Sequence, residues 1–141
     1  MGFTACVVVC GVLLFASASF FFALAESALS ALGAWRFRQL EDEPNGQLVG
    51  RLLEHPAELL ATISLGNTAA NSGIIALLLW PALKGGASLA VQLAGALAIV
   101  LVVCEVLPKA LAVRAPEQWA LRVARPMVWL QAGTGWFQRF V

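Results

Sequence analysis

Two asparagines and a glutamate stand inside apolar stretches of this sequence, where polar side chains are costly. Asn67 and Asn71 lie in a run without charged residues from 59 to 83, and their four-residue spacing places them on one face of a helix. An unpaired amide in an apolar environment costs several kcal/mol, so this face should meet protein, water or an ion. The alternative is helix packing, the usual role of small polar residues in membrane helices.

Glu105 is the second candidate, because it follows an uncharged stretch that begins at residue 85. Pro108 comes three residues later and should kink the helix, which frees the carbonyl of Cys104 from its i to i−4 hydrogen bond. A carboxylate beside a freed carbonyl suits a hard cation with oxygen ligands, such as Mg²⁺. The alternative is a Glu105–Lys109 ion pair at the water boundary, at the favoured spacing of four residues.

Other residues near these positions extend the candidate site. Gly66 and Gly73 allow close backbone approach or a break in the helix, and a break would expose carbonyl oxygens as ligands. Glu26, near the inner end of the first apolar run, is either functional or meets water, with Arg36 or Arg38 as possible partners. With Ser27 and Ser64 it is a candidate for a Na⁺ site or for gating.

The composition defines a membrane protein. The chain has 141 residues, of which 60% are hydrophobic and 12% are charged, whereas a soluble domain has about 25% charged residues. The net charge of +1 and the absence of a basic patch predict no nucleic-acid partner. The three cysteines lie in apolar runs and are expected to be free thiols. We find no Ser/His/Asp set and no phosphate-binding glycine motif, so an enzyme is not expected.

The pattern predicts an all-α fold with three transmembrane helices at about 3–32, 58–83 and 87–112. Short cytosolic-side helices should flank the turn at 43–46, one continuing the first span and one at 47–54. Basic residues alternate with Trp and Phe after residue 114, which predicts a juxtamembrane interfacial helix at about 115–141. Pro126 should begin a new segment of it, and Gly133 to Gly135 are expected to interrupt it.

Lys and Arg placement gives the orientation. The loop after the first span holds three of these residues and the tail from Lys109 holds five, whereas the loop between the second and third spans holds only Lys84. The positive-inside rule therefore puts the N-terminus outside and the C-terminus in the cytoplasm of a cell inner (plasma) membrane. Three helices enclose little polar pathway, so a homodimer surrounded by membrane lipid is expected.

Three blocks of the sequence resemble the signatures of one transporter family, the CNNM/CorC family. Residues 21–29 (FFALAESAL) resemble its FFSxSETAL, and residues 60–71 (LATISLGNTAAN) resemble its LLATIxxGNxxxN. Residues 105–117 (EVLPKALAVRAPE) resemble its EIIPKTLAxRxPE. The blocks occur in the family's order and cover nearly the whole chain, so together they are specific.

The resemblance implies a single transmembrane domain of a dimeric Mg²⁺ transporter, often described as Na⁺-coupled export. In the family, cytosolic CBS domains usually follow in a longer native chain, and they are absent from this one. Carried over, the metal ligands fall on Asn67, Glu105, the carbonyl of Ala70 and two signature serines, with Gly66 and Asn71 beside them. Both serine positions hold alanine here, Ala23 and Ala25, so two side-chain oxygens are missing from the expected Mg²⁺ site.

Two other functions remain open from the sequence. The chain could be a non-transporting membrane anchor or regulatory module, in which the polar face serves packing. It could also export another cation such as a polyamine, with Glu105 and Glu26 binding ammonium groups. Neither the direction of transport nor its coupling ion follows from the sequence.

Overall fold

The computed structural model describes residues 2–32, 36, 38–40, 42–84 and 88–138, and this part of the chain is helical apart from its connections. The helices are α1 (Gly2–Ala31), α3 (Gly46–Glu54), α4 (Pro56–Leu83), α5 (Leu89–Ile99), the π-helical η1 (Val100–Val106), α6 (Leu107–Arg114) and α7 (Pro116–Gln138). The predicted all-α fold is therefore confirmed.

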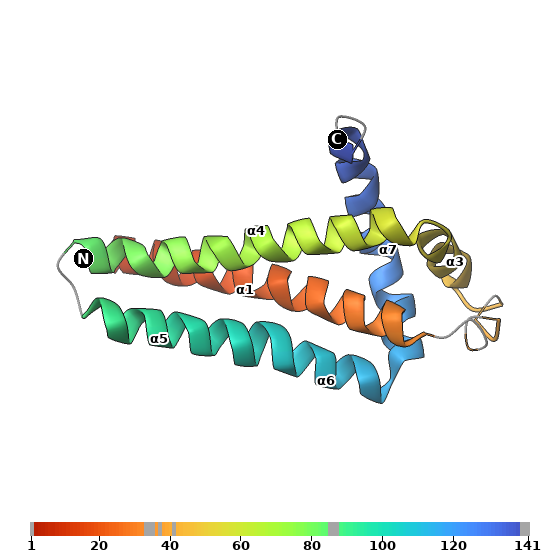
Figure 1. Cartoon of the computed structure of the whole chain (residues 1–141), viewed down its shortest axis with the longest axis horizontal. Helices are drawn as coiled ribbons and strands as arrows, with labels where there is room; N and C mark the ends of the chain where they lie inside the picture. The colour runs from red at the N-terminus through yellow and green to blue at the C-terminus, as the bar shows by residue number, and fades with distance from the viewer. Residues whose placement is uncertain (1, 33–35, 37, 41, 85–87, 139–141) are drawn as a thin grey trace.

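Within the described residues, three helices are long and apolar enough to cross a membrane, as predicted. They are Gly2–Ala31, Pro56–Pro81 and the continuous stretch Ala90–Arg114 formed by α5, η1 and α6. Figure 1 shows the three lying lengthwise, with α3 and α7 gathered at the end opposite the N-terminus. The predicted start of the third span, residue 87, lies outside the described residues, and its helix begins at Leu89.

The C-terminal helix α7 runs across the ends of the three spans (Figure 1), which suits the predicted juxtamembrane helix. Two details of that prediction were wrong. Pro126 lies inside α7 and does not begin a new segment, and the helix continues through Gly133 and Gly135 to Gln138. The last predicted residues, 139–141, lie outside the described residues.

Two contacts explain why α7 stays helical past its glycines. The hydroxyl of Thr134 lies 3.0 Å from that of Thr62 on α4, and it also donates to the carbonyl of Leu130. About one helical turn before Thr134, the side-chain amide of Gln131 donates to the carboxylate of Glu58. Tertiary contacts with α4 therefore outweigh the low helix propensity of glycine, which costs about 1 kcal/mol per residue.

Helix α3 is fastened to α7 through the residue that precedes it. Asn45 has a φ of 75°, the left-handed conformation that asparagine adopts more readily than most residues. Its side-chain oxygen accepts from Arg125 Nε at 2.7 Å, and its amide donates to the carbonyl of Leu121 at 3.4 Å. The turn predicted at 43–46 is present. The expected helical continuation of the first span was wrong at 38–40 and 42, which form turns and a bend, while 33–35, 37 and 41 lie outside the described residues; α1 ends at Ala31.

Close packing between α1 and α4 depends on glycines. A Cβ atom on Gly66 would lie 2.2 Å from Cζ of Phe22, and one on Gly73 would lie 2.8 Å from the ring of Phe15. Both glycines thus receive phenyl rings from α1. The helix α4 runs unbroken past them, so the alternative that they interrupt the helix was wrong.

Replacing Gly66 by Ala should destabilise the protein by about 1–3 kcal/mol, because the Phe22 ring must move out of a well-packed interface. Gly95→Ala is the matched control, since a Cβ there would meet nothing within 4 Å. Thermal unfolding in detergent measures both variants. Equal melting temperatures for Gly66→Ala and the wild type would contradict the packing described here.

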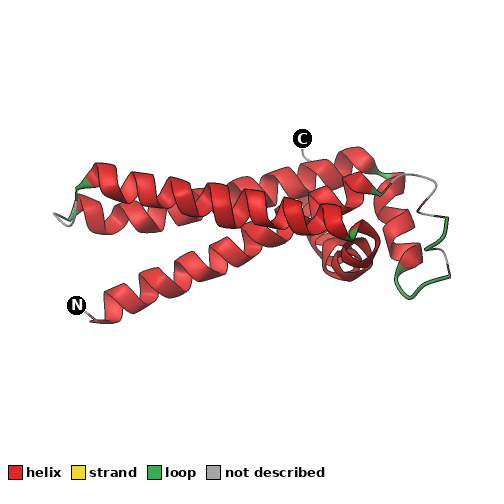
Figure 2. Cartoon of the chain, turned by 90° about the horizontal axis from the view of Figure 1, so that it is seen from below, coloured by secondary structure: helices red, strands yellow, loops and turns green. Residues whose placement is uncertain are grey.

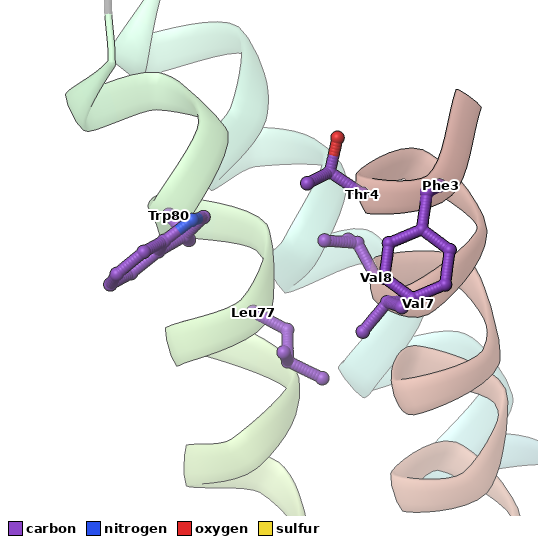
Figure 3. A pocket seen from close by; sticks show the side chains of 6 residues that line it. All are labelled: Phe3, Thr4, Val7, Val8, Leu77 and Trp80. Carbon is purple, nitrogen blue, oxygen red and sulfur yellow. The ribbon is translucent and has the colours of Figure 1, made fainter. Parts of the chain in front are cut away.

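Toward its N-terminus α1 diverges from the other spans (Figure 2). The resulting crevice, about 280 Å³, lies between the ends of α1 and α4. Figure 3 shows the side chains that line it, Phe3, Thr4, Val7, Val8, Leu77 and Trp80. This lining is almost wholly apolar, so the crevice offers few ligands to a cation.

Candidate functional site

Four polar side chains from all three spans meet within the helix bundle, and we call them the polar cluster. Ser19 comes from α1, Asn67 and Asn71 come from α4, and Glu105 comes from the π-helical segment η1. Ser19 is fully buried. Asn67 contacts both Glu105 and Asn71, so these three predicted site residues lie together.

Ser19 joins the two asparagines. Its Oγ lies 2.6 Å from Oδ1 of Asn67 and 2.7 Å from Oδ1 of Asn71, with the hydroxyl as the donor. A serine hydroxyl carries one proton, so it cannot make a full hydrogen bond to both oxygens at once. The hydroxyl oxygen of Ser19 and the two amide oxygens therefore lie close together, with one hydroxyl proton between them.

Asn67 connects this group to the third span. Its Nδ2 donates to Oε1 of Glu105 at 3.2 Å. An ionised carboxylate can only accept hydrogen bonds, so the amide group must present its nitrogen to Glu105. The amide oxygen of Asn67 is thereby turned toward Ser19, where it also lies 3.5 Å from Nδ2 of Asn71.

The second carboxylate oxygen of Glu105 is paired with a lysine. Nζ of Lys109 lies 2.9 Å from Oε2, and the side chains of Lys109 and Glu105 are 50% and 27% exposed. The ion pair considered as the alternative reading therefore forms. This ion pair leaves Oε1 of Glu105 directed at Nδ2 of Asn67.

The backbone around Glu105 is π-helical. The amide of Leu107 donates to the carbonyl of Val102, five residues back, and Pro108 follows at the start of α6. Pro108 has no N–H for the carbonyl four or five residues before it, so a widened turn accommodates the proline. The predicted disturbance thus takes the form of a π-helical segment, a feature frequent at functional sites. The buried thiol of Cys104 points at the carbonyl of Ala16, at 3.9 Å.

The remaining residues of the predicted metal site lie in packed surroundings. Ala23 and Ala25 are fully buried in α1, and Ala70 is 3% exposed in α4. In the unbroken helix α4 the carbonyl of Ala70 faces the amide of Ile74, so a cation would have to share this oxygen. The ring of Phe22 fills the space beside Gly66.

The residues considered for Na⁺ binding or gating lie on α1 and α4 and differ in burial. Glu26 and Ser27 are half-buried near the α7 end of α1, whereas Ser64 is exposed on α4. Arg36, one expected partner of Glu26, instead lies 3.9 Å from the carboxylate of Glu117 on α7.

Ser19 was missed by the sequence reasoning. A serine within a long apolar run is most simply explained by helix packing. One signal could have found it: Ser19 precedes Ala23 by four residues, so the two lie on one face of α1. A hydroxyl one turn from a position where an oxygen is expected was the available clue.

The fold and the polar cluster define an α-helical, multi-pass membrane domain with an oxygen-rich group between its spans. The chain belongs to the CNNM family: the family model described as the Cyclin M transmembrane N-terminal domain matches residues 9–140. This membership confirms the resemblance found in the three sequence blocks, and it is consistent with cation transport across a membrane.

Two DUF21 domain-containing proteins of Arabidopsis thaliana, both named as chloroplastic, are similar to this chain. One is 32% identical over 115 residues, which are 79% of this chain, and the other is 32% identical over 117 residues, or 81%. The aligned region is 18% of each plant protein. The chain thus spans about a fifth of the length of these relatives.

Proposed function

We propose that this chain is the membrane domain of a Mg²⁺ transporter, with the polar cluster as its cation site. The contact between Asn67 of α4 and Glu105 of η1 is the observation that carries the proposal, because it unites two spans through oxygen-bearing side chains. Carboxylate, amide and hydroxyl oxygens are ligands that Mg²⁺ prefers over those of softer metals.

The single carboxylate of the polar cluster suits a divalent ion that keeps part of its hydration shell when it binds. Mg²⁺ keeps several of its waters and usually binds through one or two carboxylates. Glu105 supplies one negative charge, and its 27% exposure gives water access to it. The ammonium of Lys109 holds this carboxylate neutralised and is displaced when the divalent ion binds.

Several features extend the proposal beyond the site. Transport is Mg²⁺ efflux coupled to Na⁺, and two copies of the chain form a homodimer within the plasma membrane. The N-terminus is outside, and α3 and α7 lie on the cytoplasmic side. In a longer native chain, cytosolic CBS domains would follow α7. The family resemblance and the distribution of Lys and Arg support these points.

Flux measurements in proteoliposomes test the proposal. Vesicles that hold a fluorescent Mg²⁺ indicator should show movement down an imposed Mg²⁺ gradient, faster with an opposing Na⁺ gradient. Vesicles with the Glu105→Gln variant should match protein-free vesicles. Absence of wild-type flux at any Na⁺ setting would favour a non-transporting anchor. Flux of putrescine that Mg²⁺ does not inhibit would favour polyamine export.

A further inference from the structure

We propose that the apolar crevice between the N-terminal part of α1 and the end of α4 binds an acyl chain of a membrane phospholipid whose negatively charged headgroup is held by Lys84. The crevice lies at the end of the spans opposite α3 and α7 (Figure 1). This inference does not depend on the proposed cation site, because Ser19 of the polar cluster lies about three helical turns along α1 from Val8 in the crevice.

The crevice opens where the close glycine contacts between α1 and α4 end. Gly73 of α4 receives a phenyl ring of α1, and Gly11 of α1 lies against Leu77, whose Cδ1 would be 2.6 Å from a Cβ atom on that glycine. Toward the N-terminus, bulkier residues of α1 such as Val7 and Val8 line the space instead. These side chains hold the two helices apart, so α1 diverges from α4 (Figure 2).

The size and lining of the crevice suit one hydrocarbon chain. Its volume is about 280 Å³, whereas an apolar cavity of about 150 Å³ is enough to bind benzene. Figure 3 shows Leu77 of α4 and Val8 of α1 pointing into the space between the helices. Phe3, Val7 and Trp80 on its walls are exposed. A lipid chain can therefore enter the crevice from the surrounding membrane and cover these apolar side chains.

Lys84 marks the position of the headgroup. Its ammonium lies 4.8 Å from the centre of the Trp80 ring, and Trp80 is part of the crevice wall. Tryptophan is enriched where a membrane meets water, so this end of the crevice lies at the headgroup level. A chain seated between α1 and α4 thus brings its phosphate to the ammonium. One phospholipid molecule supplies both groups.

The charges at this end of the protein favour an anionic lipid over a second copy of the chain. Lys84 is the only charged side chain within residues 1–25 and 59–104, which contain the crevice. A lipid with net negative charge therefore meets one cation and no carboxylate that would repel it. The corresponding region of a second copy has no Asp or Glu to pair with the lysine.

Fluorescence quenching of Trp80 tests this proposal. The full chain is placed in phosphatidylcholine nanodiscs in which a rising fraction of the lipid has brominated acyl chains and either a phosphatidylglycerol or a phosphatidylcholine headgroup. Trp80→Phe gives the signal of the other tryptophans, which is subtracted. We expect both lipids to quench Trp80, with phosphatidylglycerol effective at an about fivefold lower fraction, as one basic side chain near an anionic headgroup would produce.

Variants separate the headgroup contact from the seat of the chain. Lys84→Gln should abolish the preference for phosphatidylglycerol, and Lys84→Arg should keep it. Val8→Phe fills the crevice and should reduce quenching by both lipids at least about threefold. Val9→Phe is the matched control, since Val9 is exposed and lies outside the crevice lining; it should behave as the wild type.

Three results would overturn the proposal. Equal quenching by the two lipids in the wild type, or a preference that survives in Lys84→Gln, would remove the role of the lysine. Quenching that Val8→Phe leaves unchanged would show that lipid contacts Trp80 without a chain in the crevice. Quenching by neither lipid would mean that protein, such as a second copy of the chain, covers this surface.

Discussion

Replacing Glu105 by Gln should weaken Mg²⁺ binding by at least about a hundredfold. The variant keeps the side-chain shape and an oxygen that can accept from Asn67, but it removes the negative charge of the polar cluster. A divalent ion in a partly buried site depends on such a charge for much of its binding energy. Isothermal titration with Mg²⁺ measures the loss directly.

Glu54→Gln is the matched control for this experiment, because it removes the same charge from an exposed residue of α3. It should bind Mg²⁺ as the wild type does. Wild-type affinity in Glu105→Gln would refute the proposed role of the polar cluster, since Glu105 is the one carboxylate among its four side chains.

Replacing Lys109 by Met should have the opposite effect and strengthen Mg²⁺ binding about tenfold. The ammonium lies 2.9 Å from Glu105 and must give way to the divalent ion. Two unit charges about 4 Å apart attract by about 4 kcal/mol at an effective dielectric constant of 20. Because Lys109 is half-exposed, solvent screening reduces this to about 1–2 kcal/mol, which corresponds to roughly tenfold.

The same variant should be less stable than the wild type in chelator, because Glu105 loses its ion-pair partner there. Its stabilisation by Mg²⁺ should accordingly be larger. Lys84→Met serves as control, since that ammonium lies over the ring of Trp80 far from the polar cluster. Weaker Mg²⁺ binding in Lys109→Met would mean that the lysine holds Glu105 in place rather than competing with the ion.

Much of the fold follows from the apolar runs and their boundaries. Long uncharged stretches fix the three spans, because a bilayer requires about 20 apolar residues per crossing. The meeting of Asn67 with Glu105 is also predictable, since each is costly in an apolar run unless it finds a polar partner. Their contact at 3.2 Å satisfies that requirement.

The details that sequence reasoning missed depend on tertiary contacts. The sequence around Ser19 does not distinguish it from a serine that serves helix packing. Its role depends on α4, which places two amide oxygens within 2.7 Å of its hydroxyl. The glycines near Thr134 suggest a break, but the contact between Thr134 and Thr62 holds the helix against α4. Local propensity is a weak guide wherever such long-range partners exist.

The widened turn at Glu105 shows a third limit. Pro108 predicts that the hydrogen-bond ladder is disturbed, since it has no N–H to donate. The sequence does not say whether the helix bends or adopts a π-helical turn. Here Glu105 lies within the π-helical segment, which sets the direction of its side chain. The segment thus helps to place the carboxylate beside the amide of Asn67.

The most direct test of the cation site is a crystal structure in which Mn²⁺ replaces Mg²⁺. Mn²⁺ also prefers oxygen ligands, and it can be located by anomalous scattering. We predict one strong peak within about 2.5 Å of a carboxylate oxygen of Glu105 and the amide oxygen of Asn67. Excess Mg²⁺ should abolish it. Saturating Mn²⁺ with no peak among α1, α4 and η1, or with a peak only at the exposed Glu54 of α3, would contradict the proposed cation site.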